Sequence, residues 1–140
     1  MNMTVFICLD DKNGMLFNHR RQSRDKAVIE DMLSFAGYEK IYMNRYSSKL
    51  FEMVADRISV EDDFAESVPE EGLCFWEDIP LRPYEDRVEC IVVYSWNRVY
   101  PADTFLDIDL QKDWEVADIK EFGGNSHEKI TRRIYKRKDR

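Results

Sequence analysis

Two apolar runs, at residues 5–9 and 88–94, constrain the fold of this 140-residue chain more than any other feature. Neither run alternates between apolar and polar residues, so each predicts a strand that is covered on both faces. Strands of this kind are typical of mostly parallel sheets that helices flank. Shorter runs at residues 41–43 and 73–76 predict two more strands, and we expect all four in the interior of one sheet.

Helical patterns separate these strands in the first half of the chain. Ser23 predicts the N-cap of a helix that Gly37 ends, and Ser47 or Ser48 predicts the cap of a second, short helix. Further strands are expected at residues 56–60, 99–105, 114–117 and 129–135. Strands that alternate with helices early, and follow one another late, predict a single α/β domain over residues 1–140 with a mixed, mostly parallel sheet.

The chain carries 28 acidic and 21 basic side chains, so its net charge is −7. A solvated acidic face accounts for this balance, and the alternative is a patch that meets a basic partner. We expect no nucleic-acid partner, because phosphate contacts need a basic surface.

The cysteines and the hydropathy of the chain indicate the cellular compartment in which the protein works. Cys8, Cys74 and Cys90 lie inside apolar runs and lack the paired spacing of a zinc site or a disulfide framework. An odd number of buried thiols fits a reducing environment. No apolar run approaches the ~20 residues of a membrane span. We therefore expect a cytoplasmic protein that does not contact membranes.

Short motifs at both ends of the chain resemble those of dihydrofolate reductases. The first strand with its Asn-Gly turn, the Ile-Tyr-Met-Asn-Arg segment and the closing strand occur in that family's order, and so do Asp103-Thr104-Phe105 and Trp114-Glu115-Val116. The resemblance implies a dihydrofolate reductase-like fold. It also implies an ancestor that used a nicotinamide cofactor.

The middle of the chain departs from that family. Trp76-Glu77-Asp78 stands where the family has two glycines that approach the cofactor pyrophosphate, and Asn44 replaces another glycine near phosphate. Glycine allows a close backbone approach that these residues do not, and two carboxylates there would repel pyrophosphate. Pro80 and Pro83 occur in the segment that should form the supporting helix. NADPH is therefore disfavoured as a cofactor.

The resemblance assigns possible roles to a few residues. Asp25 resembles the family's buried carboxylate in its position near a helix start, although a helix dipole alone favours Asp there. Arg45 and Ser47 match an Arg and a Thr that meet cofactor phosphates. Tyr94 occupies the place of a Thr that bonds the buried carboxylate.

Basic and aromatic residues near predicted strand ends indicate a binding surface. His19, Arg20 and Arg21 precede Ser23 and the helix start, and a cationic loop at a helix N-terminus can bind an anion. A strand end later in the chain carries Trp96, Arg98 and Tyr100, which are types enriched at binding surfaces.

The sequence thus favours a binding domain without catalysis, whose ligand is a small anion or a basic protein. One alternative is an acidic inhibitor or immunity-type protein that neutralises a basic nuclease toxin, and another is a divergent nicotinamide-dependent reductase. A ribonuclease or metal hydrolase is disfavoured, because His19 and His127 are far apart in sequence and form no metal-binding motif. No metal site is expected.

Overall fold

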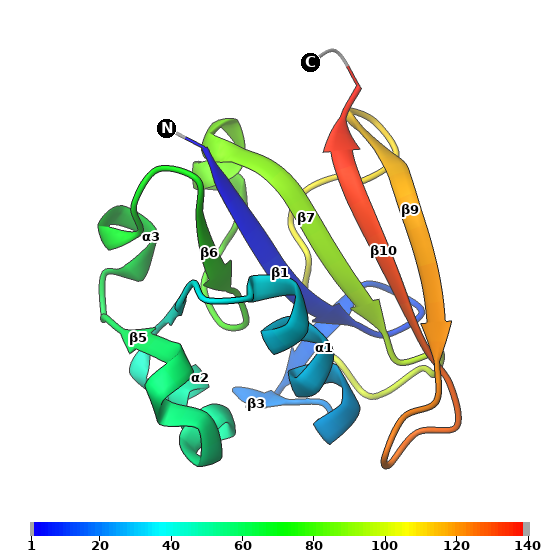
Figure 1. The fold of residues 1–140 in the computed structure, drawn as a ribbon. Coiled ribbons are helices and arrows are strands. Elements are labelled where there is room, and N and C mark those ends of the chain that lie inside the picture. The colour runs from blue at the N-terminus through cyan, green and yellow to red at the C-terminus, as the bar shows by residue number, and fades with distance from the viewer. Residues whose placement is uncertain (1, 139–140) are drawn as a thin grey trace.

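The computed structural model describes residues 2–138, which form one seven-stranded sheet and one three-stranded sheet (Figure 1). The large sheet has the order β5-β4-β6-β1-β7-β10-β9, and the small one has the order β3-β2-β8. The strands are β1 (Met3–Leu9), β2 (Gly14–Phe17), β3 (Arg20–Arg21), β4 (Ile41–Met43), β5 (Ile58–Val60), β6 (Gly72–Phe75), β7 (Val88–Ser95), β8 (Thr104–Phe105), β9 (Trp114–Phe122) and β10 (Ile130–Arg137). The helices are α1 (Lys26–Ala36), α2 (Arg45–Ser48), α3 (Phe64–Ser67) and the 3₁₀ segments η1 (Lys49–Arg57) and η2 (Arg82–Arg87).

The large sheet is parallel from β5 to β7, and β10 then joins β7 and β9 in antiparallel pairing. Strands β4, β6, β1 and β7 each have a neighbour on both sides, which confirms the four predicted inner strands. The unalternating apolar character of β1 and β7 has a direct cause, because side chains on both faces of these strands are buried. The expected α/β fold with a mixed, mostly parallel sheet is therefore confirmed.

Apolar layers cover both faces of the sheet. On one face, Phe6 and Val92 pack with Val28 and Met32 of α1. On the other face a second cluster gathers Val5, Ile7, Ile91, Phe64, Trp76 and Trp114. Figure 1 shows α1 lying across the front of the sheet, and the carboxyl ends of β1, β6 and β7 all point to the lower side of that view.

The predicted cap of the first helix was wrong by two residues, whereas Ser48 does occupy the N-cap position of η1, without a side-chain hydrogen bond to that helix. Helix α1 is capped by Asp25, whose carboxylate accepts from the Ala27 amide at 2.9 Å, so Ser23 lies two residues before the cap. Helix α2 is capped by Asn44, whose side-chain oxygen accepts from the Ser47 amide at 3.0 Å. Asn and Asp cap helices at least as well as Ser, so propensity alone could not choose between adjacent candidates. Gly37 does end α1, with a φ of 61°.

Several strand boundaries also differ from the expectation. The chain stays in the η1 helix until Arg57, so the predicted strand at 56–60 shortens to β5. Only Thr104 and Phe105 of the segment 99–105 form a strand, and they join the small sheet. Strand β9 runs to Phe122, well beyond 117, because an edge strand can carry charged side chains into solvent. Within residues 2–138, no helix is long and apolar enough to cross a membrane.

Candidate functional site at the carboxyl edge of the sheet

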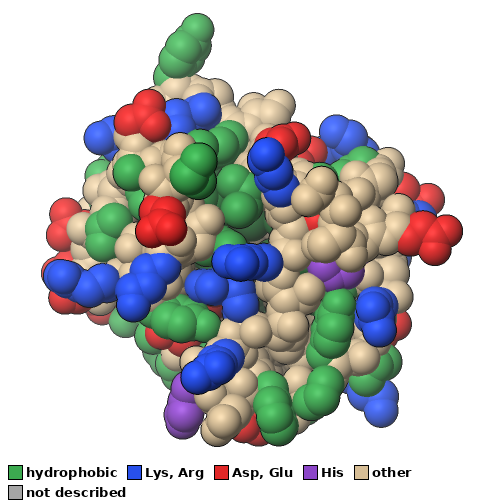
Figure 2. All heavy atoms as spheres, turned by 90° about the horizontal axis from the view of Figure 1, so that it is seen from below, with side chains coloured by type: hydrophobic (Ala, Val, Ile, Leu, Met, Phe, Trp, Pro, Cys, Tyr) green, Lys and Arg blue, Asp and Glu red, His purple; other side chains and the backbone are tan. Residues whose placement is uncertain are grey.

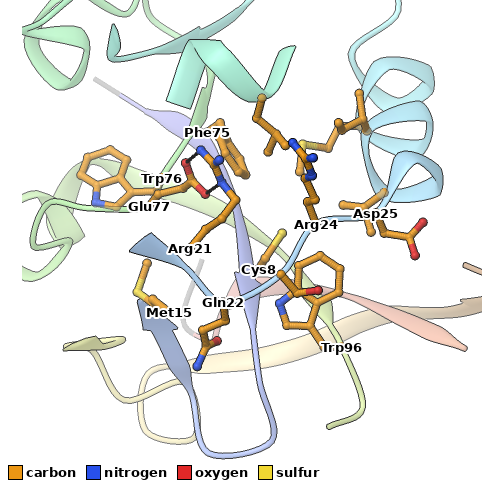
Figure 3. Close-up of a pocket in the computed structure, with 15 residues that line it drawn as sticks. Cys8, Met15, Arg21, Gln22, Arg24, Asp25, Phe75, Trp76, Glu77 and Trp96 are labelled. Atoms are coloured by element: carbon orange, nitrogen blue, oxygen red, sulfur yellow. Dashed lines mark hydrogen bonds and ion pairs between the residues drawn. The ribbon is translucent and has the colours of Figure 1, made fainter. Parts of the chain in front are cut away.

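The candidate site is a hollow at the carboxyl ends of β1, β6 and β7, which is where ligands bind in open α/β sheets (Figure 3). Cys8 lies near the end of β1, Phe75 ends β6, and Trp96 follows β7. The segment from Arg21 to Asp25 crosses the opening, and α1 closes one side. The parallel strands therefore bring together residues that are up to about ninety positions apart in the chain.

The hollow is nearly filled by side chains. Its free cavity volume is about 20 Å³, which is room for roughly one water molecule. Pockets that hold a cofactor or a drug-sized ligand are typically about 300–1,000 Å³. In the observed conformation, a ligand of that size must bind at the outer rim or displace a side chain.

An ion pair fills the part of the hollow beside β6. The Arg21 guanidinium donates to both carboxylate oxygens of Glu77, with N–O distances of 2.8 and 2.9 Å (Figure 3). The Ser47 hydroxyl donates to the same carboxylate at 2.7 Å. The pair is largely shielded from solvent, since the Arg21 and Glu77 side chains are 19% and 9% exposed. Burial alone would lower the pKa of Arg21, but the hydrogen bonds and charge of Glu77 outweigh it and raise that pKa.

Neighbouring groups hold this ion pair in place. The Tyr46 hydroxyl accepts from the Arg21 amide at 2.9 Å, and the guanidinium lies 4.8 Å from the centre of the Tyr46 ring. The Asn44 side chain donates to Asp78 at 2.7 Å. Both acids therefore have partners, since Glu77 pairs with the Arg21 cation and Asp78 accepts from a neutral amide. The Arg21–Glu77 pair fills part of the hollow, and the repulsion of a pyrophosphate by these acids stays a prediction.

Asp25 ties three parts of the chain together. Its buried carboxylate accepts from the amides of Ala27, Asn125 and Ser126, from the Ser126 hydroxyl and from His127 Nδ1. Burial alone would raise the pKa of Asp25, but these hydrogen bonds, from Asn125 above all, outweigh it and hold the pKa well below its ordinary value. Because both oxygens already have partners, Asp25 does not face the hollow as a free ligand-binding carboxylate.

The loop that Asp25 holds must approach it closely. A Cβ atom on Gly124 would lie 2.6 Å from an Asp25 carboxylate oxygen and 2.5 Å from the His127 carbonyl. Only glycine fits this position in the loop between β9 and β10 without a shift of the surrounding atoms.

His127 is the central group that the sequence did not single out. Its Nε2 atom lies 3.0 Å from the Ser23 hydroxyl and 3.0 Å from the Tyr100 hydroxyl, while Nδ1 lies 2.8 Å from Asp25. Its ring stacks on Trp96 with a centroid distance of 4.6 Å and an interplanar angle of 23°. Its only signal in the sequence was its place between Ser126 and Glu128, and these two neighbours did not indicate Ser23 or Asp25.

The predicted binding residues do not form one surface. Arg20, Arg21 and Ser23 border an open depression of about 630 Å³ with Arg24 and Tyr46. A second depression, of about 520 Å³, is bordered by Trp96, Arg98, His127 and Lys129, among others. Tyr100 lies between the two as a partner of Ser23 and His127.

Two other predicted residues sit at the periphery. His19 is exposed in the turn between β2 and β3, with a φ of 62°. Arg45 is exposed at the start of α2, and its guanidinium lies 4.0 Å from the Asp62 carboxylate. An ion pair this exposed contributes little to stability. Ser47 is buried and engaged with Glu77.

Tyr94 reaches a carboxylate, but not the one that the resemblance suggested. Its hydroxyl donates to Asp31 of α1 at 2.7 Å, and Arg132 of β10 pairs with the same acid at 2.9 Å. Burial first, and then Asp31, raise the pKa of Tyr94 far above its ordinary value. This cluster joins α1 to β10, and Asp31 does not line the hollow at the carboxyl edge. Among residues 2–138, no group of three or more potential metal ligands occurs.

Comparison with known proteins adds a fold assignment. No known family model and no curated protein matches the sequence. The structure is similar to a solved dihydrofolate reductase from Enterococcus faecalis complexed with NADP(H) and RAB-propyl, with a TM-score of 0.68 and 10% sequence identity. The similarity covers 98% of this chain and 96% of that one. The chain therefore has a dihydrofolate reductase-like fold over nearly its whole length.

Proposed function

We propose that this domain binds a small anionic ligand in the depression bordered by Arg20, Arg21, Ser23, Arg24 and Tyr46, and that it does not catalyse NADPH-dependent reduction. The observation that carries the proposal is the pair of exposed arginines, Arg20 and Arg24, whose side chains have no acidic partner among residues 2–138. Two unpaired guanidinium groups on one rim are notable in a chain with a net charge of −7.

The surroundings of these arginines suit an anion. Figure 2 views the molecule from the carboxyl edge of the parallel strands, and several basic side chains gather around a hollow in that face. Guanidinium groups offer planar sets of N–H donors that match carboxylate and phosphate oxygens. The Ser23 hydroxyl adds a further polar group on the same rim, and the Tyr46 ring an apolar one.

Phosphate or sulfate is expected to raise the melting temperature at constant ionic strength. Binding of an anion at ten times its dissociation constant stabilises the native state by about 1.4 kcal/mol, which corresponds to several degrees for a domain of this size. The double variant Arg20→Ala/Arg24→Ala should lose this response. Arg24 is a better test position than Arg21, because Arg21 pairs with Glu77.

A matched control separates this effect from a general change in charge. Arg82 and Lys112 are also exposed, and Arg82→Ala/Lys112→Ala removes the same two positive charges away from the depression. This control should respond to sulfate as the wild type does. If the wild type responds equally to sulfate and to chloride of the same ionic strength, the proposed site does not exist.

A divergent reductase is the second candidate, because the fold is similar to that of a reductase solved with NADP(H). We expect isothermal titration to detect no NADPH binding at millimolar concentrations and no reduction of dihydrofolate. A cofactor whose pyrophosphate entered the hollow would have to displace the Arg21–Glu77 pair, and breaking a buried pair costs about 3–5 kcal/mol, or roughly 10²–10⁴ in affinity. A micromolar dissociation constant, with NMR shifts at Arg45 and Glu77, would instead identify a rearranged reductase site.

A further inference from the structure

We propose that Ser23, His127 and Asp25 form a nucleophile, a general base and an orienting carboxylate, and that the domain cleaves carboxylic esters that carry a negative charge. This activity goes beyond the binding function above. The three residues come from the segment before α1 and from the loop between β9 and β10, so only the folded chain brings them together.

The geometry is a continuous relay of hydrogen-bonded groups. Ser23 Oγ lies 3.0 Å from His127 Nε2, and His127 Nδ1 lies 2.8 Å from Asp25 Oδ2. An ionised Asp25 accepts the Nδ1 proton, which leaves Nε2 free to take a proton from a hydroxyl group. Nucleophile and base within hydrogen-bonding distance, with the base oriented by a third group, are the signature of an activated nucleophile.

The base is held rigidly and is shielded from water. The His127 and Asp25 side chains are 4% and 0% exposed. The Trp96 ring stacks on the imidazole, and the amides of Asn125 and Ser126 fix the carboxylate. The amides of Asn125 and Ser126 would anchor the loop to Asp25 at the start of α1 without any contribution from His127. Anchoring of the loop therefore does not explain why His127 Nε2 lies beside the Ser23 hydroxyl.

Ser23 is placed to meet a substrate. It is half-buried and borders both the narrow hollow and the open depression where Arg20 and Arg24 lie. These arginines would attract a carboxylate or phosphate group elsewhere on the ester. Cys8 also lines the hollow, but burial, with Glu77 next, raises the pKa of its thiol far above the usual range, so the reactive thiolate is not formed there.

The proposed reaction has two balanced steps. Ser23 Oγ attacks the ester carbonyl while its proton moves to His127 Nε2, and the imidazolium then returns that proton to the departing alcohol as the carbon–oxygen bond breaks. Water next attacks the Ser23 acyl ester with His127 again as the base. The second step releases the carboxylic acid and restores the serine hydroxyl.

Tyr100 is the competing hydroxyl, since its oxygen also lies 3.0 Å from Nε2 and lies 3.5 Å from Ser23 Oγ. The proposal assigns the nucleophile to Ser23, because it borders the open depression. The position of a covalent label therefore distinguishes the two hydroxyls.

An uncharged fluorophosphonate probe tests the relay without depending on anion binding. The folded wild-type chain should be labelled, and peptide mass spectrometry should place the label on Ser23. Labelling should vanish in Ser23→Ala and fall by about 10²–10⁴-fold in His127→Gln, the usual contribution of general base catalysis. Ser67→Ala, which removes an exposed serine hydroxyl from α3, should behave as the wild type.

Two further measurements address the roles of Asp25 and the arginines. In Asp25→Asn, at a temperature where the variant is folded, labelling should fall steeply, because an asparagine amide does not hold the imidazole in the tautomer that leaves Nε2 free to accept a proton. Asp25→Glu keeps the carboxylate and should recover part of the labelling. If folded Asp25→Asn is labelled at the wild-type rate, Asp25 has only a structural role. Wild-type protein should hydrolyse nitrophenyl succinate faster than nitrophenyl acetate, and Arg20→Ala/Arg24→Ala should remove that preference.

Several results would overturn the proposal. The relay is absent if the folded wild type is not labelled, if the label lies on Tyr100, or if His127→Gln is labelled at the wild-type rate. Equal hydrolysis of the two esters would overturn the assigned substrate class. Because the probe is uncharged, failure of the anion-binding proposal leaves the labelling result intact, and the two proposals can fail separately.

Discussion

Asp25→Ala is expected to lower the free energy of unfolding by about 3–5 kcal/mol, the range for removal of one partner from a buried charged network. The substitution removes the N-cap of α1 and leaves His127 and the amides of Asn125 and Ser126 without their acceptor. Urea denaturation followed by circular dichroism measures the change. Asp56→Ala is the matched control, because Asp56 is exposed, and exposed substitutions usually change stability by no more than about 0.5 kcal/mol.

The same carboxylate gives the stability a defined pH dependence. The folded-state pKa of Asp25 lies below its ordinary value of 3.8, so its contribution is complete above that value and is lost as the pH falls toward the folded-state pKa. The wild type should therefore lose stability in acid more steeply than Asp25→Ala does. Equal slopes for the two proteins below pH 4 would contradict the assigned network.

Arg21→Ala is expected to destabilise the domain by about 3–5 kcal/mol, because it leaves the Glu77 carboxylate buried without its cation. Arg20→Ala changes the adjacent, exposed arginine of β3 and should alter stability by no more than about 0.5 kcal/mol. Chemical denaturation of both variants makes the comparison directly.

A double substitution shows whether Arg21→Ala lowers the stability because it leaves the Glu77 charge unpaired. Arg21→Met/Glu77→Leu removes both charges, and replacement of a buried ion pair by apolar residues is often neutral or stabilising. The double variant should therefore be more stable than Arg21→Ala. If the two are equally unstable, the effect of Arg21 lies in its packing against Tyr46 and not in its charge.

The sequence predicted the sheet well because burial of a parallel strand leaves a local signal. Residues 88–94 are apolar without alternation, and β7 has neighbours on both sides. The edge strand β9 was predicted too short, because its outward side chains are charged and its pattern resembles a loop. The predicted cap of α1 was wrong for a different reason, because Ser23 and Asp25 are both good capping residues and tertiary contacts favour Asp25.

The candidate site was harder to predict, because its groups meet only in space. Arg21 was expected to be free for a ligand and Glu77 to repel one, but the two residues, 56 positions apart, neutralise each other. His127 and Asp25 are 102 positions apart, and nothing local marks either as a partner of the other. Residue type and spacing singled out residues such as Ser23 and Arg20, which border the depression at this edge, but could not show which residues are their neighbours in the fold.

The contact between Asp25 and the loop at Asn125–His127 has a consequence for the order in which the chain folds. Strand β1 can pair with its neighbours only after β6 and β7 have been synthesised. The contacts of Asp25, which caps α1, are complete only after the loop that precedes β10 has been synthesised. Such long-range contacts slow folding, because loop-closure entropy is lost before they form. On a ribosome, the first helix would therefore remain incompletely stabilised until nearly all of the chain had emerged, and the last strand would complete the domain.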